Sequence, residues 1–533
     1  MLPEADCPPG TMAIPGDAEC RGVGSCGEGK WGDLPTGAST HYVDGAFSGA
    51  SDGTAERPWS TIADGVANAP AGGLVAVAAG TYLEDLMLDK PVRLHGVCAD
   101  QVTLRGTGQA QATIGMYVGS DGAEVAGVGI TGPAIGVLVA GSVDLVLDRV
   151  RLYDLGSRGV NVQDDIGPTS LTVQDSIIEN VQEFGIFVAG ATVVVDSTVV
   201  RDVAPVSPPD LGRGINARDG VGGAPTQLLV TRSVIARTHQ AGVFIEDTEA
   251  TIDGSVVRDT VPLNDAESGR GINVQGIGIY WTSLVLTRSL VANNHSAGVY
   301  VADAEAVLEG VIIRDTAPGN TGVGRGLDVE GEVELQRTVS LRSSLLLRNT
   351  EFGAFFAGVE VTIDSTRIST TAATGRNGFN LGHALQVRDG PNGLPGTLSM
   401  TASLLEDCEE AGLSVVHSTV MLDNVAVRTV RTTSKPPLRF GDGVLVVSSG
   451  DGAAYLRNSL VAHAARAGIA AFGSHVELEA TTLDCNAIDI NGETNDTVES
   501  SLADSGGNRC GCGADERDCH ILSTALEPPS TDY

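Results

Sequence analysis

Short runs of alternating apolar and polar residues recur along most of this chain at a constant interval. The stretch 185–202, GIFVAGATVVVDSTVVRD, returns in altered form every 55–59 residues. Its copies start at Gly185, Gly242, Gly298, Gly353, Gly412 and Gly468. A second series lies between these copies and starts at Gly159, Gly214, Gly271, Gly326, Ala384 and Gly443. The true repeat is therefore half as long, and each repeat is one turn of a stacked structure.

Each repeat holds three short alternating runs and leaves no room for a helix. In the repeat that starts at Gly185, the first run contains Ile186 and Val188, the second Val193 and Val195, and the third Val199. Leucine-rich repeats have similar periods, but three strand-like runs per turn argue against them. The pattern predicts an all-β solenoid, a single-stranded parallel β-helix with three strands per coil.

The repeated motif, G-I-x-V, then D-S-x-V, then a turn with Asp or Asn, resembles the right-handed parallel β-helix of the pectin-lyase-like superfamily. The resemblance covers about residues 74–490 and implies a right-handed helix. It implies little about activity, because one fold hosts many functions. In that superfamily saccharide chains lie on a sheet with long loops on both sides. Here the longest connections flank the G-x-x-x run, so the resemblance points to that face.

The ends of the chain differ from the repeats. A short helix is expected at residues 60–69, because Ser60 is a candidate N-cap, Ile62 and Val66 are spaced i, i+4, and Pro70 ends the pattern. This helix would close the first open end of the solenoid. The expected parts are a Cys-rich segment (1–40), an N-terminal cap (41–73), the β-helix (74–490) and a Cys-rich C-terminal cap or tail (491–533).

The net charge of the chain limits the kinds of molecule that it can bind. The formal net charge is −34 and the chain has three lysines, Lys30, Lys90 and Lys435. This balance excludes electrostatic binding of nucleic acid or of an anionic membrane, and leaves divalent cations as plausible partners. No run of 18 apolar residues is present, so we expect no membrane span. Met1 is not followed by a signal peptide, so we expect a trimmed form, which leaves room for a lipid anchor upstream.

Nine cysteines concentrate at the two ends of the chain. They are Cys7, Cys20, Cys26, Cys98, Cys408, Cys485, Cys510, Cys512 and Cys519. The clustering predicts disulfides in an oxidising compartment, and the odd number leaves one thiol without a partner in the chain. Cys510, Cys512, Cys519 and His520 also form a zinc ligand set, but the C-x-C spacing favours disulfides. The first forty residues resemble the Cys-rich leaders of secreted bacterial β-helix proteins, many of them lipoproteins of unknown role. This resemblance implies a secreted or cell-surface protein, with an outer-membrane lipoprotein as one form.

A ladder of amides and aromatics is predicted on the G-x-x-x face. By alternation, the second residue after each repeat glycine points outward. These residues are Asn161, Phe187, Asn216, Phe244, Asn273, Tyr300, Asp328, Phe355 and Gln386. Aromatics on every second coil recur at ~9.6 Å, close to a disaccharide in an extended polysaccharide, so the ladder is a candidate glycan-binding surface. Arg158, Arg213, Arg270 and Arg325 would flank it and would suit an acidic glycan. The alternative is that loops cover the aromatics, and that these arginines pair with Asp154, Asp202, Asp259 and Asp315 and stabilise the stack.

Catalytic candidates lie where the repeat departs from its own pattern. The coils that start at Gly326 and Ala384 carry Asp328, Glu330, His383 and Arg388. The two carboxylates would hold Ca²⁺ against a uronate, with Arg388 or His383 as the base. The alternative is repeat drift with solvated charges. Of the polygalacturonase signatures only the Asp164–Asp165 pair is present, and the pectate-lyase signatures are missing.

Three functions follow in order of preference. The first is an exported monomer that binds extracellular polysaccharide without catalysis along the outward face of the G-x-x-x sheet. The second is a polysaccharide lyase or glycoside hydrolase that acts on an acidic glycan. The third is a structural or adhesive surface rod, favoured if loops or terminal segments cover that face. No cofactor is predicted with certainty, and Ca²⁺ is the one candidate. No separate metal-binding site is predicted.

Overall fold

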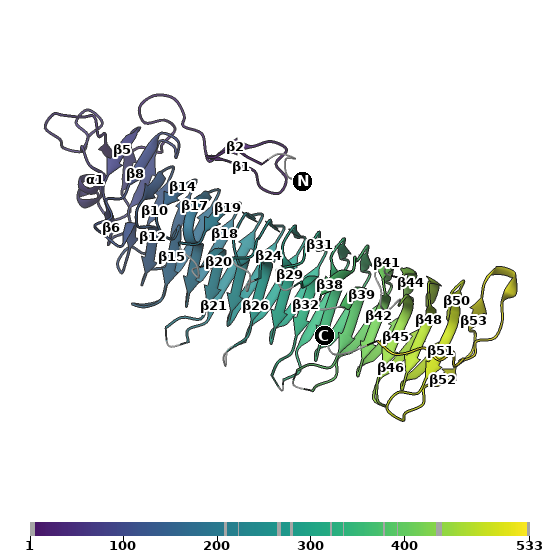
Figure 1. The fold of residues 1–533 in the computed structure, drawn as a ribbon. Coiled ribbons are helices and arrows are strands. Elements are labelled where there is room, and N and C mark those ends of the chain that lie inside the picture. Colours follow the sequence, from purple (N-terminus) through teal and green to yellow (C-terminus); the bar gives the residue numbers. More distant parts are fainter. Residues whose placement is uncertain are drawn as a thin grey trace. The chain divides into compact units, whose positions relative to one another are not determined.

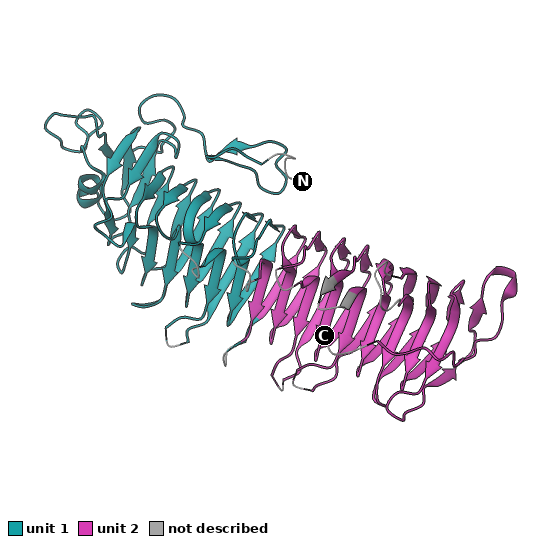
Figure 2. Cartoon of the chain, in the orientation of Figure 1, with its two compact units in different colours: residues 1–263, 277–282 teal, residues 264–276, 283–533 magenta. Residues whose placement is uncertain are grey.

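The computed structural model describes residues 6–206, 211–221, 223–263, 268–277, 281–319, 322–333, 335–376, 379–391, 393–432 and 440–529. The chain is a right-handed parallel β-helix with three strands per coil, which confirms the predicted fold class (Figure 1). It divides into two compact units (Figure 2). Unit 1 holds residues 1–263 and 277–282, and unit 2 holds residues 264–276 and 283–533.

Unit 1 begins with an antiparallel hairpin of β1 (Thr11–Met12) and β2 (Arg21–Gly22). The predicted capping helix is α1 (Ile62–Asn68), and its N-cap is Thr61 rather than Ser60. The Thr61 hydroxyl accepts a hydrogen bond from the backbone N–H of Asp64, and this bond fixes the helix start one residue later than expected. No helix in the described part of the chain has the length and apolarity needed to cross a membrane.

Three parallel sheets build the coils of unit 1. Sheet 1, which carries the G-x-x-x runs, contains β6 (Leu86–Leu88), β9 (Ala112–Met116), β12 (Ile135–Ala140), β15 (Val160–Gln163), the end of β17 (Ile177–Ala189), β20 (Gly212–Arg218) and β23 (Ala241–Glu246). Sheet 2 contains β3 (His41–Val43), β4 (Leu74–Val77), β7 (Arg93–Gly96), β10 (Glu124–Ala126), β13 (Leu145–Asp148), β16 (Ser170–Gln174), β18 (Thr192–Asp196), β21 (Thr226–Thr231) and β24 (Thr248–Asp253). Sheet 3 contains β5 (Gly80–Leu83), β8 (Val102–Arg105), β11 (Gly129–Gly132), β14 (Arg151–Leu155), the start of β17, β19 (Val199–Ala204), β22 (Val234–Ala236) and β25 (Val256–Arg258).

Unit 2 has the same three sheets. Its sheet 1 contains β26 (Arg270–Gln275), β29 (Ser296–Ala302), β32 (Gly324–Glu330), β35 (Glu351–Ala357), β39 (Phe379–Arg388), β42 (Ala411–Val416), β45 (Asp442–Val447), β48 (Ala467–Phe472) and β51 (Ile488–Glu493). Sheet 2 contains β27 (Ser283–Thr287), β30 (Glu305–Glu309), β33 (Thr338–Arg342), β36 (Glu360–Asp364), β40 (Thr397–Thr401), β43 (Thr419–Asp423), β46 (Ala453–Arg457), β49 (His475–Glu479) and β52 (Ser501–Asp504). Sheet 3 contains β28 (Leu290–Ala292), β31 (Ile312–Arg314), β34 (Leu345–Leu347), β37 (Arg367–Ser369), β41 (Leu404–Glu409), β44 (Ala426–Arg431), β47 (Leu460–Ala464), β50 (Thr482–Asp484) and β53 (Arg509–Gly511). Two short elements complete the unit, β38 (Thr374–Arg376), antiparallel to the start of β39, and the 3-10 helix η1 (Gly513–Asp515).

A ladder of hydroxyl groups lies inside the coils, at the residue just before the sheet 3 strands β17, β19, β22 and β25. The hydroxyl of Ser176 is buried and accepts a hydrogen bond from the backbone N–H of Val150, one coil earlier. In the same way Ser233 accepts from Thr198, and Ser255 accepts from Ser233. Each hydroxyl thus satisfies a backbone donor at a sharp corner that no ladder bond reaches.

Four disulfides fasten the ends of the chain. They are Cys7–Cys20, Cys26–Cys98, Cys485–Cys512 and Cys510–Cys519, and Cys408 is a buried free thiol. The preference for disulfides over a zinc site is therefore confirmed, because the three C-terminal thiols are all oxidised. At the N-terminal end, the guanidinium of Arg201 donates to the carbonyl of Cys7, and Asp6 pairs with Arg258. These bonds hold the first described residues against sheet 3 of unit 1.

Candidate functional site

The outer face of sheet 1 in unit 1 carries the first half of the predicted ladder, and its members are largely buried. Asn161 is 1%, Asn216 3% and Phe244 5% exposed, and Phe187 is half-buried. The cover comes from the arginines that precede the repeat glycines. The guanidinium carbon of Arg213 lies 3.6 Å from the centre of the Phe244 ring. The guanidinium carbon of Arg158 lies 4.5 Å from the centre of the Phe187 ring.

Each of these arginines also satisfies an amide of its own strand. Arg158 Nη1 donates to Asn161 Oδ1 at 2.6 Å, and its other nitrogens form a fork with the carboxylate of Glu183. Arg213 Nη1 donates to Asn216 Oδ1, also at 2.6 Å. One side chain therefore spans two coils, because it bonds the amide of its own coil and stacks on the ring of the next.

Unit 2 repeats this arrangement. Arg270 lies 3.4 Å from the centre of the Tyr300 ring, and its Nη1 donates to Asn273 Oδ1 at 3.2 Å. Arg325 lies 3.8 Å from the centre of the Phe355 ring. Asn273, Tyr300, Asp328, Phe355 and Gln386 are all buried, at 0–7% exposed.

The ring faces that a sugar would need are thus occupied by guanidinium groups. The exposure that the predicted glycan ladder requires is absent at every member except the half-buried Phe187. The alternative, a ladder that stabilises the stack, agrees with this burial, but the partners expected for the arginines were wrong. Asp202 pairs with Arg237 and Asp315 with Arg348, and in each pair the arginine directly follows the sheet 3 strand of the next coil, β22 or β34.

The carboxylates proposed for catalysis share a single arginine. Arg325 Nη1 lies 2.9 Å from Asp328 Oδ1 and 3.1 Å from Glu330 Oε1, while its Nε lies 3.3 Å from Glu351 Oε2. Burial raises the pKa of Glu330, and the neighbouring Asp328 carboxylate adds to the rise. The Tyr300 hydroxyl lies 3.4 Å from the Glu330 carboxylate. Asp328 and Glu330 do come together, but around a guanidinium and not around an open cation position.

His383 and Arg388 do not join this cluster. Strand β35 lies between β32 and β39, so Ala357 separates Glu330 from Arg388 in the sheet register. His383 is 4% exposed, and burial lowers its pKa to about 3. It packs edge-on against Phe352, with the ring centres 5.3 Å apart. A neutral, buried imidazole and an arginine two strands away do not form the predicted base next to a held uronate.

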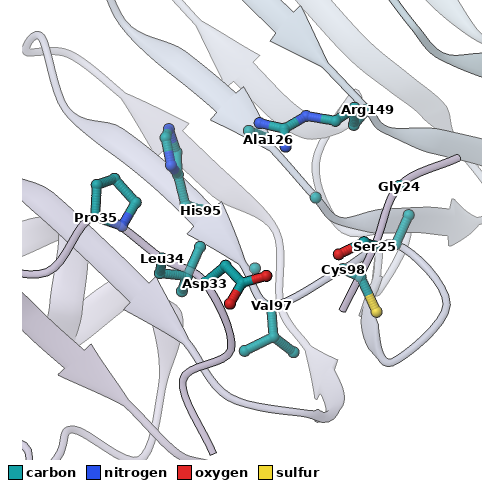
Figure 3. A pocket seen from close by; sticks show the side chains of 13 residues that line it. Gly24, Ser25, Asp33, Leu34, Pro35, His95, Val97, Cys98, Ala126 and Arg149 are labelled. Atoms are coloured by element: carbon teal, nitrogen blue, oxygen red, sulfur yellow. The ribbon is translucent and has the colours of Figure 1, made fainter. Parts of the chain in front are cut away.

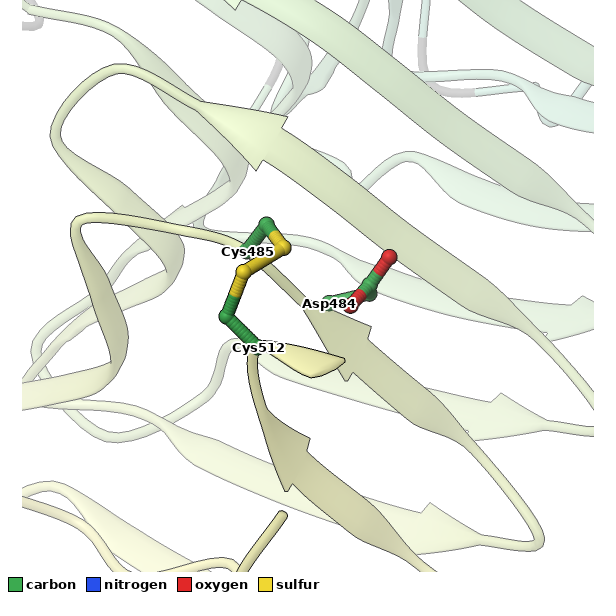
Figure 4. A group of neighbouring side chains, drawn as sticks. All are labelled: Asp484, Cys485 and Cys512. Carbon is green, nitrogen blue, oxygen red and sulfur yellow. A yellow bond between two sulfur atoms is a disulfide. The ribbon is translucent and has the colours of Figure 1, made fainter. Parts of the chain in front are cut away.

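One group of side chains has metal-like spacing among the described residues. Asp484, Cys485 and Cys512 place ligand atoms within 4.8 Å of one another (Figure 4). Cys485 and Cys512 are joined as a disulfide, so their sulfurs are not thiolate ligands. The group does not fit a metal ion.

A small cavity lies under the N-terminal segment of unit 1 (Figure 3). Its volume is about 130 Å³, and the Cys26–Cys98 disulfide ties its cover to its floor. His95, on the floor, has its Nε2 3.1 Å from Glu124 Oε1. A cavity near 150 Å³ holds a benzene-sized molecule, so a polysaccharide chain does not enter this one.

The outer face of sheet 2 in unit 2 holds an open recess that the sequence reasoning missed. Its volume is about 400 Å³, and β40, β43, β46 and β49 form it. Met421 and Tyr455, at the middle outward positions of β43 and β46, are 53% and 37% exposed. The charged side chains along it are Asp423, Arg457, Glu477 and Glu479. The sequence does show a change at this position. Met421 and Tyr455 are large side chains, whereas the three preceding sheet 2 strands carry the small polar residues Ser340, Thr362 and Ser399 there.

Comparisons with known proteins assign the chain to no family and leave its function open. No protein-family description and no curated protein matches the chain. Solved structures with a similar fold include an alginate lyase from Paenibacillus sp. str. FPU-7, which is 16% identical in sequence. The alignment covers 48% of this chain and 94% of that chain, with a TM-score of 0.38. Pectate lyase Pel9A is 16% identical and covers 61% of this chain and 78% of that chain with a TM-score of 0.36. The N-terminal fragment of bacteriophage Phi29 gene product 12 is 11% identical and covers 84% of this chain and 89% of that chain with a TM-score of 0.44.

At these identities the similarity concerns the fold alone. The three parallel sheets of each unit confirm the resemblance to the pectin-lyase-like architecture. The narrower resemblance, to Cys-rich secreted lipoproteins, stays a prediction.

Proposed function

We propose that this protein binds a polysaccharide chain without catalysis, in the sheet 2 recess of unit 2 around Tyr455. The observation that carries the proposal is the pairing of an exposed aromatic side chain with hydrogen-bonding groups in a recess of about 400 Å³. The apolar face of a sugar ring packs on an aromatic ring, while hydroxyls bond to nearby carboxylates and guanidinium groups. The predicted ladder on sheet 1 offers no such open ring.

The charge of the recess favours a neutral glycan. Asp423, Glu477 and Glu479 face one arginine, Arg457, which itself pairs with Glu479 at 2.7 Å. An acidic polysaccharide would be repelled by this surplus and by the net charge of −34. The earlier reason for an acidic glycan was the row of sheet 1 arginines. Those arginines no longer favour an acidic glycan, because Arg158 and Arg325 are already paired with carboxylates of the chain itself.

An exported location is part of the proposal. Four disulfides support an oxidising compartment, because they do not persist in a reducing cytosol. Cell-surface attachment, a lipid anchor and a monomeric state stay predictions.

Co-sedimentation and affinity electrophoresis test the binding site. Purified protein would be tested with insoluble xylan, β-glucan and α-glucan, and with polygalacturonate and alginate as acidic probes. We expect retention by a neutral glycan, weakened about tenfold or more by Tyr455→Ala. The control is Val307→Ala, because Val307 is also an outward sheet 2 residue and is 42% exposed. Unchanged retention of Tyr455→Ala, or retention by the acidic glycans alone, would reject the proposed site.

The second candidate function is that of a hydrolase or lyase, and the environment of Glu330 supports it. Glu330 is a half-buried carboxyl group with a raised pKa, as a general acid requires. The same samples would be assayed for reducing ends and, with Ca²⁺ added, for absorbance at 235 nm. New reducing ends that are lost in Glu330→Gln would indicate hydrolysis, and a rise in absorbance at 235 nm would indicate a lyase. If the samples give neither binding nor products, the structural or adhesive rod is the remaining function.

A further inference from the structure

The outer face of sheet 1 changes character in the last coils of unit 2. From β26 to β39, most of its outward positions carry amides, aromatics and charged groups. In β45 and β48 they carry Leu445, Val447, Ala470 and Phe472. These four side chains are 0–4% exposed although they point away from the interior of the coil. An apolar outer surface of this kind is stable in water only under a cover.

The C-terminal segment Ile521–Pro529, here called the tail, provides cover. The N–H of Leu522 donates to the carbonyl of Ile490, and the N–H of Gly492 donates to the carbonyl of Leu522, so the tail begins as a short addition to β51. The side chain of Leu526 then packs against the apolar surface. In Figure 2 the chain turns back over the strands of its own unit after the last coil.

The tail is held mainly through its backbone. The carboxylate of Glu493 accepts hydrogen bonds from the backbone N–H groups of Thr524, at 2.8 Å, and Leu526, at 3.3 Å. The side-chain oxygen of Asn491 accepts from the Thr524 hydroxyl at 2.6 Å. Side-chain acceptors on the sheet thus bind an extended backbone, while one leucine fills an apolar surface. Peptide-binding grooves divide affinity and specificity in this way.

The docked tail is also strained. Ala525 has φ +58°, a left-handed conformation that residues with a Cβ disfavour. Its neighbours Thr524 and Glu527 are exposed, and Leu526 is half-buried. The surface beneath the tail is more completely buried than the tail itself. Another peptide can displace a segment with these properties, because a peptide without the strained residue makes the same contacts at a lower conformational free energy.

We propose that Leu445, Val447, Ala470 and Phe472, with Glu493 and Asn491 at their edge, form a peptide-binding groove. Its partner is an extended segment of another protein that presents backbone N–H donors to Glu493 and Asn491 and one leucine to the apolar surface. The tail is the resident competitor for this groove. The proposal is independent of glycan binding, because the groove lies on sheet 1 and the recess on sheet 2.

Fluorescence anisotropy with a labelled peptide tests the groove on the full chain. The probe is the sequence 521–529, and a second peptide carries aspartate at the position of Leu526. In the Leu526→Asp protein the resident tail loses its anchor while the groove stays intact. We expect this variant to bind the wild-type peptide at least tenfold more tightly than the wild-type protein does. Ala525→Gly relieves the strain, tightens the resident tail and should weaken binding of the peptide severalfold.

Two controls and three contrary results complete the test. Leu335→Asp makes the same change at a leucine that is 53% exposed outside the tail, and it should bind the peptide like the wild type. The aspartate peptide should not bind the Leu526→Asp protein. Equal binding of both peptides, or no binding of either, would overturn the proposal. A concentration-dependent dimer that Leu526→Asp abolishes would also overturn it, by assigning the groove to the tail of a second copy.

Discussion

Replacing Phe244 by alanine tests whether the sheet 1 ladder is structural. Phe244 is 5% exposed, and the guanidinium carbon of Arg213 lies 3.6 Å from its ring centre. In the register of β20 and β23 it stands beside Asn216, which the same arginine bonds. Removing a buried phenylalanine costs about 3–5 kcal/mol. The lost cation–π contact accounts for about 0.5–2 kcal/mol of that change. We therefore expect Phe244→Ala to lower the free energy of unfolding by about 4 kcal/mol.

Guanidinium chloride unfolding followed by circular dichroism measures this change, and hydrogen exchange in β20 and β23 localises it. Local exchange matters, because stacked repeats lose cooperativity and one global free energy then understates a local loss. The matched control is Leu229→Ala in β21, an apolar residue of the same unit that is 36% exposed. It should cost less than about 1 kcal/mol.

The same two variants should retain polysaccharide as the wild type does. A Phe244→Ala protein that unfolds like the wild type and fails to bind polysaccharide would refute the reasoning. That result would mean that Arg213 leaves the ring in solution and that the ladder is the glycan platform first predicted from the sequence.

Two further changes test the buried charges of unit 2. Arg325→Ala leaves Asp328, Glu330 and Glu351 without their shared guanidinium and should lower the melting temperature at pH 7, at a cost of about 3–5 kcal/mol. The loss should be smaller at pH 5, because burial raises the pKa of Glu330 and this carboxyl group takes up a proton as the pH falls. An equal loss at both pH values would contradict this account. Burial lowers the folded-state pKa of His383 to about 3 from its ordinary 6.5, so the unfolded state binds the proton first, and stability that is present above about pH 6.5 is lost as the pH falls toward 3. The loss reaches about 5 kcal/mol, and pH-dependent unfolding of His383→Gln beside the wild type measures it; identical pH profiles would show that the imidazole is not buried.

The repeat glycines explain why the fold could be predicted. A Cβ on Gly159 would lie 2.5 Å from the carbonyl oxygen of Gly185, the equivalent residue one coil on. The same close approach recurs at Gly185, where the Cβ would lie 2.6 Å from the carbonyl oxygen of Gly214. Eleven of the twelve repeat positions named above therefore hold glycine and one, Ala384, holds alanine, so the close stacking of the coils is visible as a period in the sequence. Inward positions such as Ile186 and Val188 are fully buried, as alternation predicts.

The candidate site could not be predicted in the same way. Alternation gives the direction in which a side chain leaves a strand, and not what covers it. The motif R-G-x-N shows Arg213 and Asn216 together in the sequence, but Phe244 meets Arg213 only through the register of two strands in consecutive coils. Long arginine stems bridge that distance, and no local pattern reports it. The tail was likewise expected only as a cap, because its contact with Leu445 and Phe472 depends on a chain reversal.

Cover decides which face of a repeated structure is available to a partner. Every coil presents three outer faces, and composition alone ranks them poorly as binding surfaces. In unit 2, arginines and the tail bury the outward residues of sheet 1, whereas Met421 and Tyr455 on sheet 2 stay exposed. Met421 and Tyr455 are neighbours in the sheet register, and exposed apolar surface of this kind invites association with other chains. The charges around Tyr455, three of them carboxylates, reduce that risk and leave the ring open to an uncharged ligand. Cover therefore leaves little accessible surface on sheet 1 of unit 2, and the sheet 2 recess is the open face on which the proposed binding rests.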